Sequence, residues 1–252
     1  MPDLVDSLIS RDLREMIVVS VDGWTSFDGS WYRNSPVFGD FETYIVKELV
    51  QHIDDTYRTI SHRESRGIVG YSMGGEGAIH LGFSYPEVFG VVASLNGPFD
   101  FHNDVMLAPG LEGFRSDPKS FMELRLLHGR TQAYFAWAAI NAPNPNNTPF
   151  FVEKPFRLVD GKAEVVPEVW DKLSTAGVLH EIDQYMSQPV RLQGILLANG
   201  KNDTLVPIDL AQAFDSALTE QGIEHEFQTH PGGHTDFEMA PLLRYMSDNL
   251  VF

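Results

Sequence analysis

The stretch that decides the fold reads Gly67-Ile68-Val69-Gly70-Tyr71-Ser72-Met73-Gly74-Gly75. Its first half is an apolar, β-branched run typical of a buried strand, and residues 74–85 continue with a helical pattern. A serine at such a strand-to-helix turn lies on strained backbone, so Gly70 and Gly74 must let the neighbouring chain pass without a clashing Cβ. The turn is expected to expose the Ser72 hydroxyl and to aim the Met73 N–H at a developing oxyanion.

The pattern Gly-x-Ser-x-Gly also occurs by chance, and its alternative interpretation is a glycine-rich turn with an incidental serine. Its position between a strand-like and a helix-like segment favours the catalytic interpretation. A serine hydroxyl is a poor nucleophile until a base removes its proton, so the interpretation requires a histidine and an acid elsewhere in the chain.

Both partners are present in the order that such folds require, with the acid first and the histidine second. Asp203 follows the apolar run 194–198 within a polar loop, and His234 follows the run 226–229 within a glycine-rich loop. We therefore predict that His234 is the general base and that Asp203 orients it and stabilises its imidazolium form.

Other residues compete for these roles. Asp100 follows the run 91–95 and could also reach a histidine, although a solvated loop acid is the simpler interpretation. His230 is expected to be structural, and Asp236 is too near His234 in sequence to approach its far side. The spacing of His234 and Glu238 fits a pair of metal ligands, but one pair without a third ligand is a weak indication. We expect no metal and no cofactor.

The rest of the chain alternates short apolar runs with helical patterns, which predicts an α/β fold with a mostly parallel sheet and helices on both faces. An amphipathic helix is expected at the N-terminus. The expected strands are residues 16–21, 67–71, 91–95, 194–198 and 226–229. The expected helices of this core are residues 40–57, with Asp40 as a possible cap, and 74–85, 207–222 and 237–250.

The alternation stops between residues 98 and 189. Helical patterns over 121–142 and 166–186 flank a segment rich in proline and asparagine, which predicts a helical insertion or cap over the edge of the sheet. The core would then comprise residues 1–97 and 190–252. The aromatic residues Tyr134, Phe135 and Trp137 are expected to pack inside the insertion rather than to form a ligand site.

The amino-acid composition excludes several kinds of binding partner. The 252 residues include 18 basic and 35 acidic side chains, for a formal net charge of −17, and no cysteine. Such a surface would repel nucleic acid and anionic lipid, and a disulfide framework or a cysteine-ligated zinc site is impossible. No apolar run approaches the roughly 18 residues of a membrane span, and the N-terminal residues do not have the pattern of a signal peptide. We expect a cytoplasmic enzyme whose partner is a small molecule.

Together these motifs resemble the esterase D-like branch of the α/β-hydrolases, which includes S-formylglutathione hydrolases, feruloyl esterases and mycolyltransferases. The resemblance is carried by residues 22–45, 70–75, 84–90 and 93–97. It implies the same roles for Ser72, Asp203, His234 and the Met73 amide, and it suggests that Trp24 and Trp31 bind substrate.

One element of that family has no counterpart here. The resemblance implies a strand between those at 16–21 and 67–71, whose loop supplies a second oxyanion N–H. We expect either that the two flanking strands pair directly, with a donor near Gly23 and Trp24 as a substitute, or that another copy of the chain fills the gap in a homo-oligomer. The leading hypothesis is a serine carboxylesterase for small or short-chain acyl esters. The alternatives are an acyltransferase, or a binding or scaffold protein with a weak oxyanion hole.

Overall fold

The computed structural model describes residues 2–11, 13–101, 114–127, 129–160, 162–236 and 238–252, and the chain divides by its contacts into two units. The first, called the sheet unit, comprises Met1–Val21, Ile45–Phe99 and Glu181–Phe252. The second, called the aromatic unit, comprises Asp22–Tyr44 and Asp100–His180. The second unit overlaps most of the predicted insertion, but it also includes residues 22–44, which were expected in the core.

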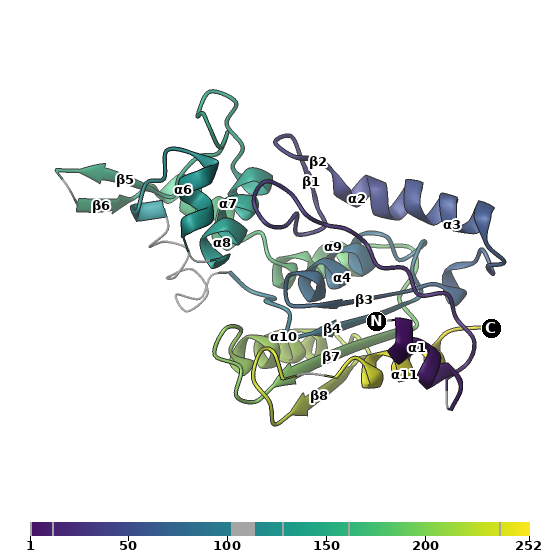
Figure 1. Cartoon of the computed structure of the whole chain (residues 1–252). Helices are drawn as coiled ribbons and strands as arrows, with labels where there is room; N and C mark the ends of the chain where they lie inside the picture. The colour runs from purple at the N-terminus through teal and green to yellow at the C-terminus, as the bar shows by residue number, and fades with distance from the viewer. Residues whose placement is uncertain (1, 12, 102–113, 128, 161, 237) are drawn as a thin grey trace. The chain divides into compact units, whose positions relative to one another are not determined.

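Four parallel strands form the sheet of the first unit (Figure 1). In spatial order they are β3 (Gly67–Tyr71), β4 (Val91–Leu95), β7 (Gly194–Gly200) and β8 (Glu226–His230). All four were predicted, and each is confirmed. The register pairs Tyr71 with Leu95 and Gly200 with His230, so the carboxyl ends of the strands lie at one edge of the sheet.

Helices cover both faces of this sheet. Successive side chains of β4 point to opposite faces, and the residues on both faces are buried by a helix. On one face, β4 packs against α11 (Ala240–Asn249) through an apolar cluster of Val91, Ala93, Leu95, Leu242, Tyr245 and Met246. On the other face lies α4 (Met73–Ser84), where a Cβ added to Gly82 would come within 2.2 Å of Val92 Cγ1. Burial on both sides explains why every residue of β4 is buried and why the strand tolerates few polar residues.

Further helices extend the two layers. On the α4 face, Phe83 stacks on Tyr185 of α9 (Ile182–Met186) with ring centroids 4.2 Å apart, and lies 6.1 Å from Phe214 of α10 (Ile208–Glu220). On the α11 face, α1 (Pro2–Ile9) packs Val5 and Leu8 against Leu243. The predicted N-terminal, 207–222 and 237–250 helices are thus confirmed, although Phe237 lies outside the described residues.

The predicted helix over 40–57 is present but irregular. It consists of α2 (Phe41–Thr43), the π-helical segment η1 (Tyr44–Leu49) and α3 (Val50–Thr56), and a short 3₁₀ turn, η2 (Arg63–Ser65), follows before β3. Asp40 precedes α2, but its side chain makes no capping hydrogen bond.

The aromatic unit combines short helices with two small antiparallel pairs, β1 (Asn34–Ser35) with β2 (Gly39–Asp40), and β5 (Phe156–Val159) with β6 (Lys162–Val165). Trp137 of α7 (Gly129–Asn141) is fully buried at its centre. The ring of Trp137 stacks on Phe101 at 4.2 Å and meets Trp31 edge-on at 5.0 Å. Tyr134 and Phe135 are buried as well, so the packing interpretation of this aromatic stripe is confirmed.

Two predicted helices of this region are divided. The first becomes α6 (Phe121–Leu126) and α7, and the second becomes α8 (Pro167–Ser174), the 3₁₀ turn η3 (Val178–Glu181) and α9. Glycines at the breaks, Gly129 and Gly177, favour this outcome because glycine is a poor helix former. The pair β5–β6 was missed, although an Asp160-Gly161 dipeptide between two short β-like runs is a recognised hairpin signal.

The prediction of a strand over residues 16–21 is wrong. These residues form no strand, and within the described ranges β3 pairs with β4 alone. Direct pairing of 16–21 with β3 is therefore wrong too. Local β propensity can favour an extended chain, but a strand also needs a neighbour whose N–H and C=O groups meet its own. The side chains of Ile17, Val18 and Val19 are 49%, 38% and 39% exposed.

Candidate active site

Ser72 occupies the single residue between the end of β3 and the start of α4. Its backbone has φ 54° and ψ −120°, a sparsely populated combination for a residue with a side chain. The Ser72 N–H donates to the Leu95 carbonyl at 2.8 Å, which ties the turn to the end of β4. The sequence expectation of a strained strand-to-helix turn is met in its geometry.

The glycines around Ser72 are required by close backbone approach. A Cβ on Gly70 would lie 1.8 Å from the Gly74 carbonyl oxygen, and one on Gly75 would lie 2.6 Å from Ser94 Oγ. A side chain at position 70 would require movement of the turn, and one at position 75 would require movement of the Ser94 side chain. The first glycine of the pattern, Gly70, is therefore a steric consequence of the chain returning sharply on itself.

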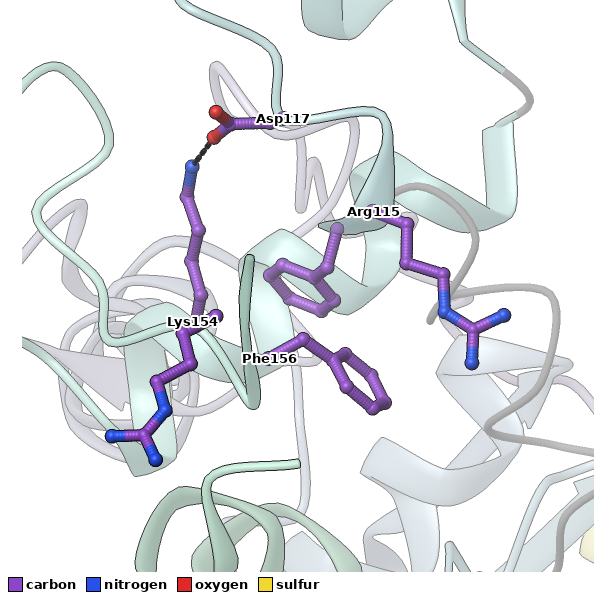
Figure 2. A pocket seen from close by; sticks show the side chains of 6 residues that line it. Arg115, Asp117, Lys154 and Phe156 are labelled. Atoms are coloured by element: carbon purple, nitrogen blue, oxygen red, sulfur yellow. Dashed lines mark hydrogen bonds and ion pairs between the residues drawn. The ribbon is translucent and has the colours of Figure 1, made fainter. Parts of the chain in front are cut away.

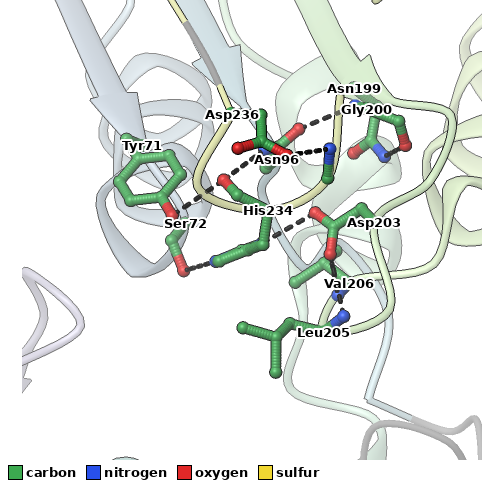
Figure 3. A network of polar contacts seen from close by, with 11 residues as sticks. Tyr71, Ser72, Asn96, Asn199, Gly200, Asp203, Leu205, Val206, His234 and Asp236 are labelled. Carbon is green, nitrogen blue, oxygen red and sulfur yellow. Dashed lines mark hydrogen bonds and ion pairs between the residues drawn. The ribbon is translucent and has the colours of Figure 1, made fainter. Parts of the chain in front are cut away.

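The structure brings Asp203 and His234 together with Ser72 (Figure 3). Asp203 lies in the loop after β7, and His234 lies in the loop after β8. The distance from His234 Nδ1 to Asp203 Oδ2 is 2.7 Å, and the distance from His234 Nε2 to Ser72 Oγ is 2.9 Å. The Asp203 side chain is fully buried and that of His234 is 11% exposed.

The hydrogen bonds of Asp203 define the tautomer of His234. Asp203 Oδ1 accepts from the Leu205 and Val206 N–H groups, both at 2.8 Å, which holds the carboxylate in place. Its other oxygen faces His234 Nδ1, and a carboxylate only accepts, so Nδ1 carries the proton. In the neutral imidazole, Nε2 then carries no proton and can accept the hydrogen of the Ser72 hydroxyl. The three groups thus form one chain of hydrogen bonds from Asp203 to Ser72.

The competing residues have other surroundings. Asp100 belongs to the aromatic unit, and Asp236 Oδ2 accepts from the Gly233 N–H at 3.1 Å within its own loop. His230 Nδ1 faces the Gly232 N–H at 3.2 Å. Over the described ranges of the chain, no group of three or more His, Asp or Glu side chains could hold a metal ion, so the spacing of His234 and Glu238 leads to no such cluster.

The remaining predicted site residues differ in their surroundings. Met73 is the first residue of α4, so its N–H has no acceptor within the helix and lies beside Ser72. Trp24 is 69% exposed, and its N–H donates to Asp22 Oδ1 at 3.0 Å. Trp31 is 4% exposed, and its indole N–H donates to the Ala133 carbonyl at 2.8 Å within the aromatic unit. Substrate binding by the two tryptophans stays a prediction.

Two residues that sequence reasoning did not assign also reach this site. The Tyr71 hydroxyl and the Asn96 side-chain amide both donate to the backbone carbonyl of His234 (Figure 3). A signal for Asn96 was available, because it is the polar residue directly after an entirely apolar strand, as Asp203 and His234 also follow strands. No comparable signal marks Tyr71, since its ring fits an ordinary strand end.

A cavity of about 200 Å³ in the aromatic unit is a second place where charged side chains gather (Figure 2). It is lined by Phe114, Arg115, Asp117, Lys154, Phe156 and Arg157. Lys154 is paired with Asp117, and Arg157 lies 3.3 Å from Glu164. Arg115 extends away from Lys154 in Figure 2, with its guanidinium over the Phe156 ring at 5.3 Å. The cations do not converge on one point, so we assign no chemistry to this cavity.

Among the described residues, no helix is long and apolar enough to cross a bilayer.

Known proteins share this fold. A ferulic acid esterase superposes with a TM-score of 0.56 at 19% identity, covering 98% of this chain and 76% of that one. An S-formylglutathione hydrolase from Agrobacterium tumefaciens gives 0.54 at 15% identity, covering 96% and 69%. These likenesses show the α/β-hydrolase fold that the sequence predicted.

Two curated relatives are similar along most of the chain. Esterase Rv1288 and esterase MT1326, from two strains of Mycobacterium tuberculosis, are each 26% identical over 239 residues, which is 91% of this chain. The chain spans 44% of the length of these relatives. Residues 3–240 match the model of the Esterase family, which is described as "Putative esterase". Because that match extends over nearly the whole chain, this protein belongs to the esterase family.

Proposed function

We propose that this chain is a serine carboxylesterase that hydrolyses small or short-chain acyl esters. The observation that carries the proposal is the continuous chain of contacts from Asp203 through His234 to Ser72, at 2.7 and 2.9 Å. Both distances lie within the range in which a base can take a proton from a nucleophile. Family membership agrees with ester hydrolysis as the reaction class.

In the proposed reaction, Ser72 Oγ attacks the ester carbonyl carbon while His234 Nε2 takes the hydroxyl proton. The carbonyl oxygen becomes an oxyanion, which the Met73 N–H at the start of α4 can stabilise. Collapse of this intermediate breaks the bond to the alcohol, and the imidazolium returns its proton to the leaving oxygen. Water then attacks the acyl-enzyme by the same route and releases the acid. Asp203 stabilises the imidazolium in both steps.

A second candidate is a binding protein with weak turnover, and one observation favours it. A substitute second oxyanion donor was expected near Gly23 and Trp24, and in this region the Trp24 N–H already donates to Asp22 Oδ1. Loss of one oxyanion donor can lower kcat by about 10²–10³. Acyl transfer to an alcohol is the remaining alternative within the same chemistry, and adding an alcohol acceptor to the assay distinguishes it by the ester that forms.

The test uses a p-nitrophenyl ester series from acetate to decanoate, together with a fluorophosphonate probe. Ser72→Ala is expected to lower kcat by a factor on the order of 10⁴ or more and to abolish labelling, because both depend on the same oxygen. Ser216→Ala is the control, since that serine is exposed on α10 and bonds only to its own helix at Gln212. Unchanged hydrolysis by Ser72→Ala would overturn the proposal. Wild-type folding without turnover would favour the binding protein.

A further inference from the structure

The backbone of His234 is held by two side chains from other strands. Its carbonyl oxygen accepts one hydrogen bond from the Tyr71 hydroxyl and one from Asn96 Nδ2, both at 2.9 Å. Tyr71 ends β3 and Asn96 directly follows β4, whereas His234 lies on the loop after β8. Two donors, one from the end of β3 and one from the residue after β4, therefore fix a point on this loop.

The orientation of the Asn96 amide is unambiguous. Asn96 is fully buried, and its Oδ1 accepts from the Gly200 N–H at 2.9 Å. The backbone N–H of Asn96 donates to the Ala198 carbonyl at 2.8 Å. A backbone N–H can only donate and a carbonyl can only accept, so Oδ1 must face Gly200 and Nδ2 must face His234. All the polar atoms of the side chain are then used.

These contacts place Asn96 between the three loops of the proposed triad. The residue before it, Leu95, accepts the Ser72 N–H at 2.8 Å. Gly200, which bonds to Asn96 Oδ1, in turn accepts the Asp203 N–H at 3.2 Å. Asn96 also has a φ of 51°, a left-handed conformation that asparagine tolerates better than most residues. One residue at the end of β4 thus connects the nucleophile turn, the acid loop and the base loop.

Tyr71 adds a second constraint on the same histidine. Its ring centroid lies 5.1 Å from that of His234 at a tilt of 42°, so the ring limits sideways movement of the imidazole while the hydroxyl holds the backbone. Burial, and after it the negative charge of Asp203, raise the pKa of Tyr71 above its usual value. The phenol therefore keeps its proton, and with it its role as a donor, over the neutral range.

We propose that Asn96 and Tyr71 are positioning residues of the esterase, which hold the His234 loop so that Nε2 faces Ser72 Oγ while Nδ1 faces Asp203. This inference rests on the proposed function. Displacement of a catalytic group by about 1 Å can lower a rate by about 10²-fold, so contacts that never touch substrate can still control kcat.

Three variants test the proposal. Tyr71→Phe removes only the hydroxyl. Asn96→Asp keeps the shape of the side chain and the oxygen that accepts from the Gly200 N–H, but it places a second acceptor oxygen against the His234 carbonyl. Asn96→Gly allows the same left-handed backbone and removes both side-chain hydrogen bonds. Matched controls lie in the same unit: Tyr185→Phe, whose hydroxyl accepts from the Leu192 N–H at 2.9 Å, and Asn249→Asp, whose amide donates to the Tyr245 carbonyl at 2.9 Å.

The measurements are kcat and KM for p-nitrophenyl acetate, the rate constant for phosphonylation of Ser72 at saturating fluorophosphonate, and the downfield proton resonance of the His234–Asp203 hydrogen bond. We expect each single variant to lower kcat and the phosphonylation rate about 10-fold with KM within about 2-fold, and to broaden the resonance. Tyr71→Phe combined with Asn96→Asp should lose more than the product of the single effects, because each donor holds the carbonyl when the other is absent. The controls should keep the wild-type rates.

The failure of this inference is distinguishable from that of the proposed function. Full hydrolysis by Ser72→Ala would overturn the proposed serine esterase, and the positioning role of Asn96 and Tyr71 would fall with it. If Ser72 is essential, wild-type kcat and phosphonylation in Tyr71→Phe and in a folded Asn96 variant overturn the positioning role alone. The positioning role is also overturned if the loss of activity only matches the loss of folded protein, or if KM changes while kcat does not. Tyr71→Phe keeps the test decisive if neither Asn96 variant folds.

Discussion

The two units of this protein are stabilised in different ways. In the sheet unit, parallel backbone ladders align the strand ends, and the side chains that meet there are polar and held by hydrogen bonds, as Asn96 and Asp203 show. In the aromatic unit, ring packing dominates. Trp31, Phe101 and Trp137 share edge and face contacts, and the indole N–H of Trp137 donates to the Leu173 carbonyl at 2.8 Å.

This difference shows why the proposed chemistry lies in the sheet unit. A ladder repeats at a fixed spacing and leaves its last residues at one edge, so separate loops can deliver a nucleophile, an acid and a base to the same place. Ring packing buries apolar area and specifies shape, but it leaves few polar groups to converge. If this contrast holds, substitutions at the strand ends of the sheet unit should lower activity, and substitutions in the ring cluster of the aromatic unit should lower stability.

The largest expected effect is at the acid of the sheet unit. Asp203→Asn should lower kcat by about 10³–10⁴, because an amide at this position can favour the wrong tautomer of His234. Asp100→Asn, in the aromatic unit, should stay within about 3-fold of wild type. Steady-state kinetics on p-nitrophenyl acetate measure both. A severe loss in Asp100→Asn with an active Asp203→Asn would reverse the assignment of the acid.

The next effect concerns stability in the aromatic unit. Trp137→Ala removes a fully buried ring that contacts Trp31 and Phe101, and we expect a loss of about 3–5 kcal/mol in the free energy of unfolding. The hydrogen bonds described above for Ser72, His234 and Asp203 all join residues of the sheet unit, so a small fluorophosphonate should still label Ser72 in the folded variant.

Trp24→Ala is the matched control for this comparison, because that ring is 69% exposed. Its free energy of unfolding should change by less than about 0.5 kcal/mol. Denaturant titration measures both variants. Equal destabilisation by the two tryptophan variants would contradict the view that ring packing around Trp137 holds the aromatic unit.

The same contrast explains how far the sequence could be interpreted. The four strands and the positions of Ser72, Asp203 and His234 could be predicted because each depends on a local pattern and on the rule that parallel strands end at one edge. The burial of Trp31 could not, because it depends on rings at positions 101 and 137. The strand expected at 16–21 was wrong because no local pattern shows whether a neighbouring strand is present. The homo-oligomer suggested to complete that part of the sheet stays a prediction.

The smallest effects compare one buried phenol in each unit. In the sheet unit, burial and then the negative charge of Glu226 raise the pKa of Tyr245 to about 12. In the unfolded chain a tyrosine has a pKa near 10. Between pH 10 and 12 the folded protein therefore keeps this proton and the unfolded chain loses it. The free energy of unfolding falls as pH rises over that window. Tyr245→Phe should show a shallower fall over that window in denaturant titrations at stepwise pH.

Tyr134 of the aromatic unit should behave differently at neutral pH. Burial raises its pKa as well, but its buried hydroxyl has no hydrogen-bond partner among the residues that the structure describes. An unsatisfied buried hydroxyl opposes folding, so Tyr134→Phe should be at least as stable as wild type at pH 7, with a gain of up to about 1 kcal/mol. A clear loss at pH 7 would mean that this hydroxyl is satisfied in solution and that its hydrogen bond helps to stabilise the aromatic unit.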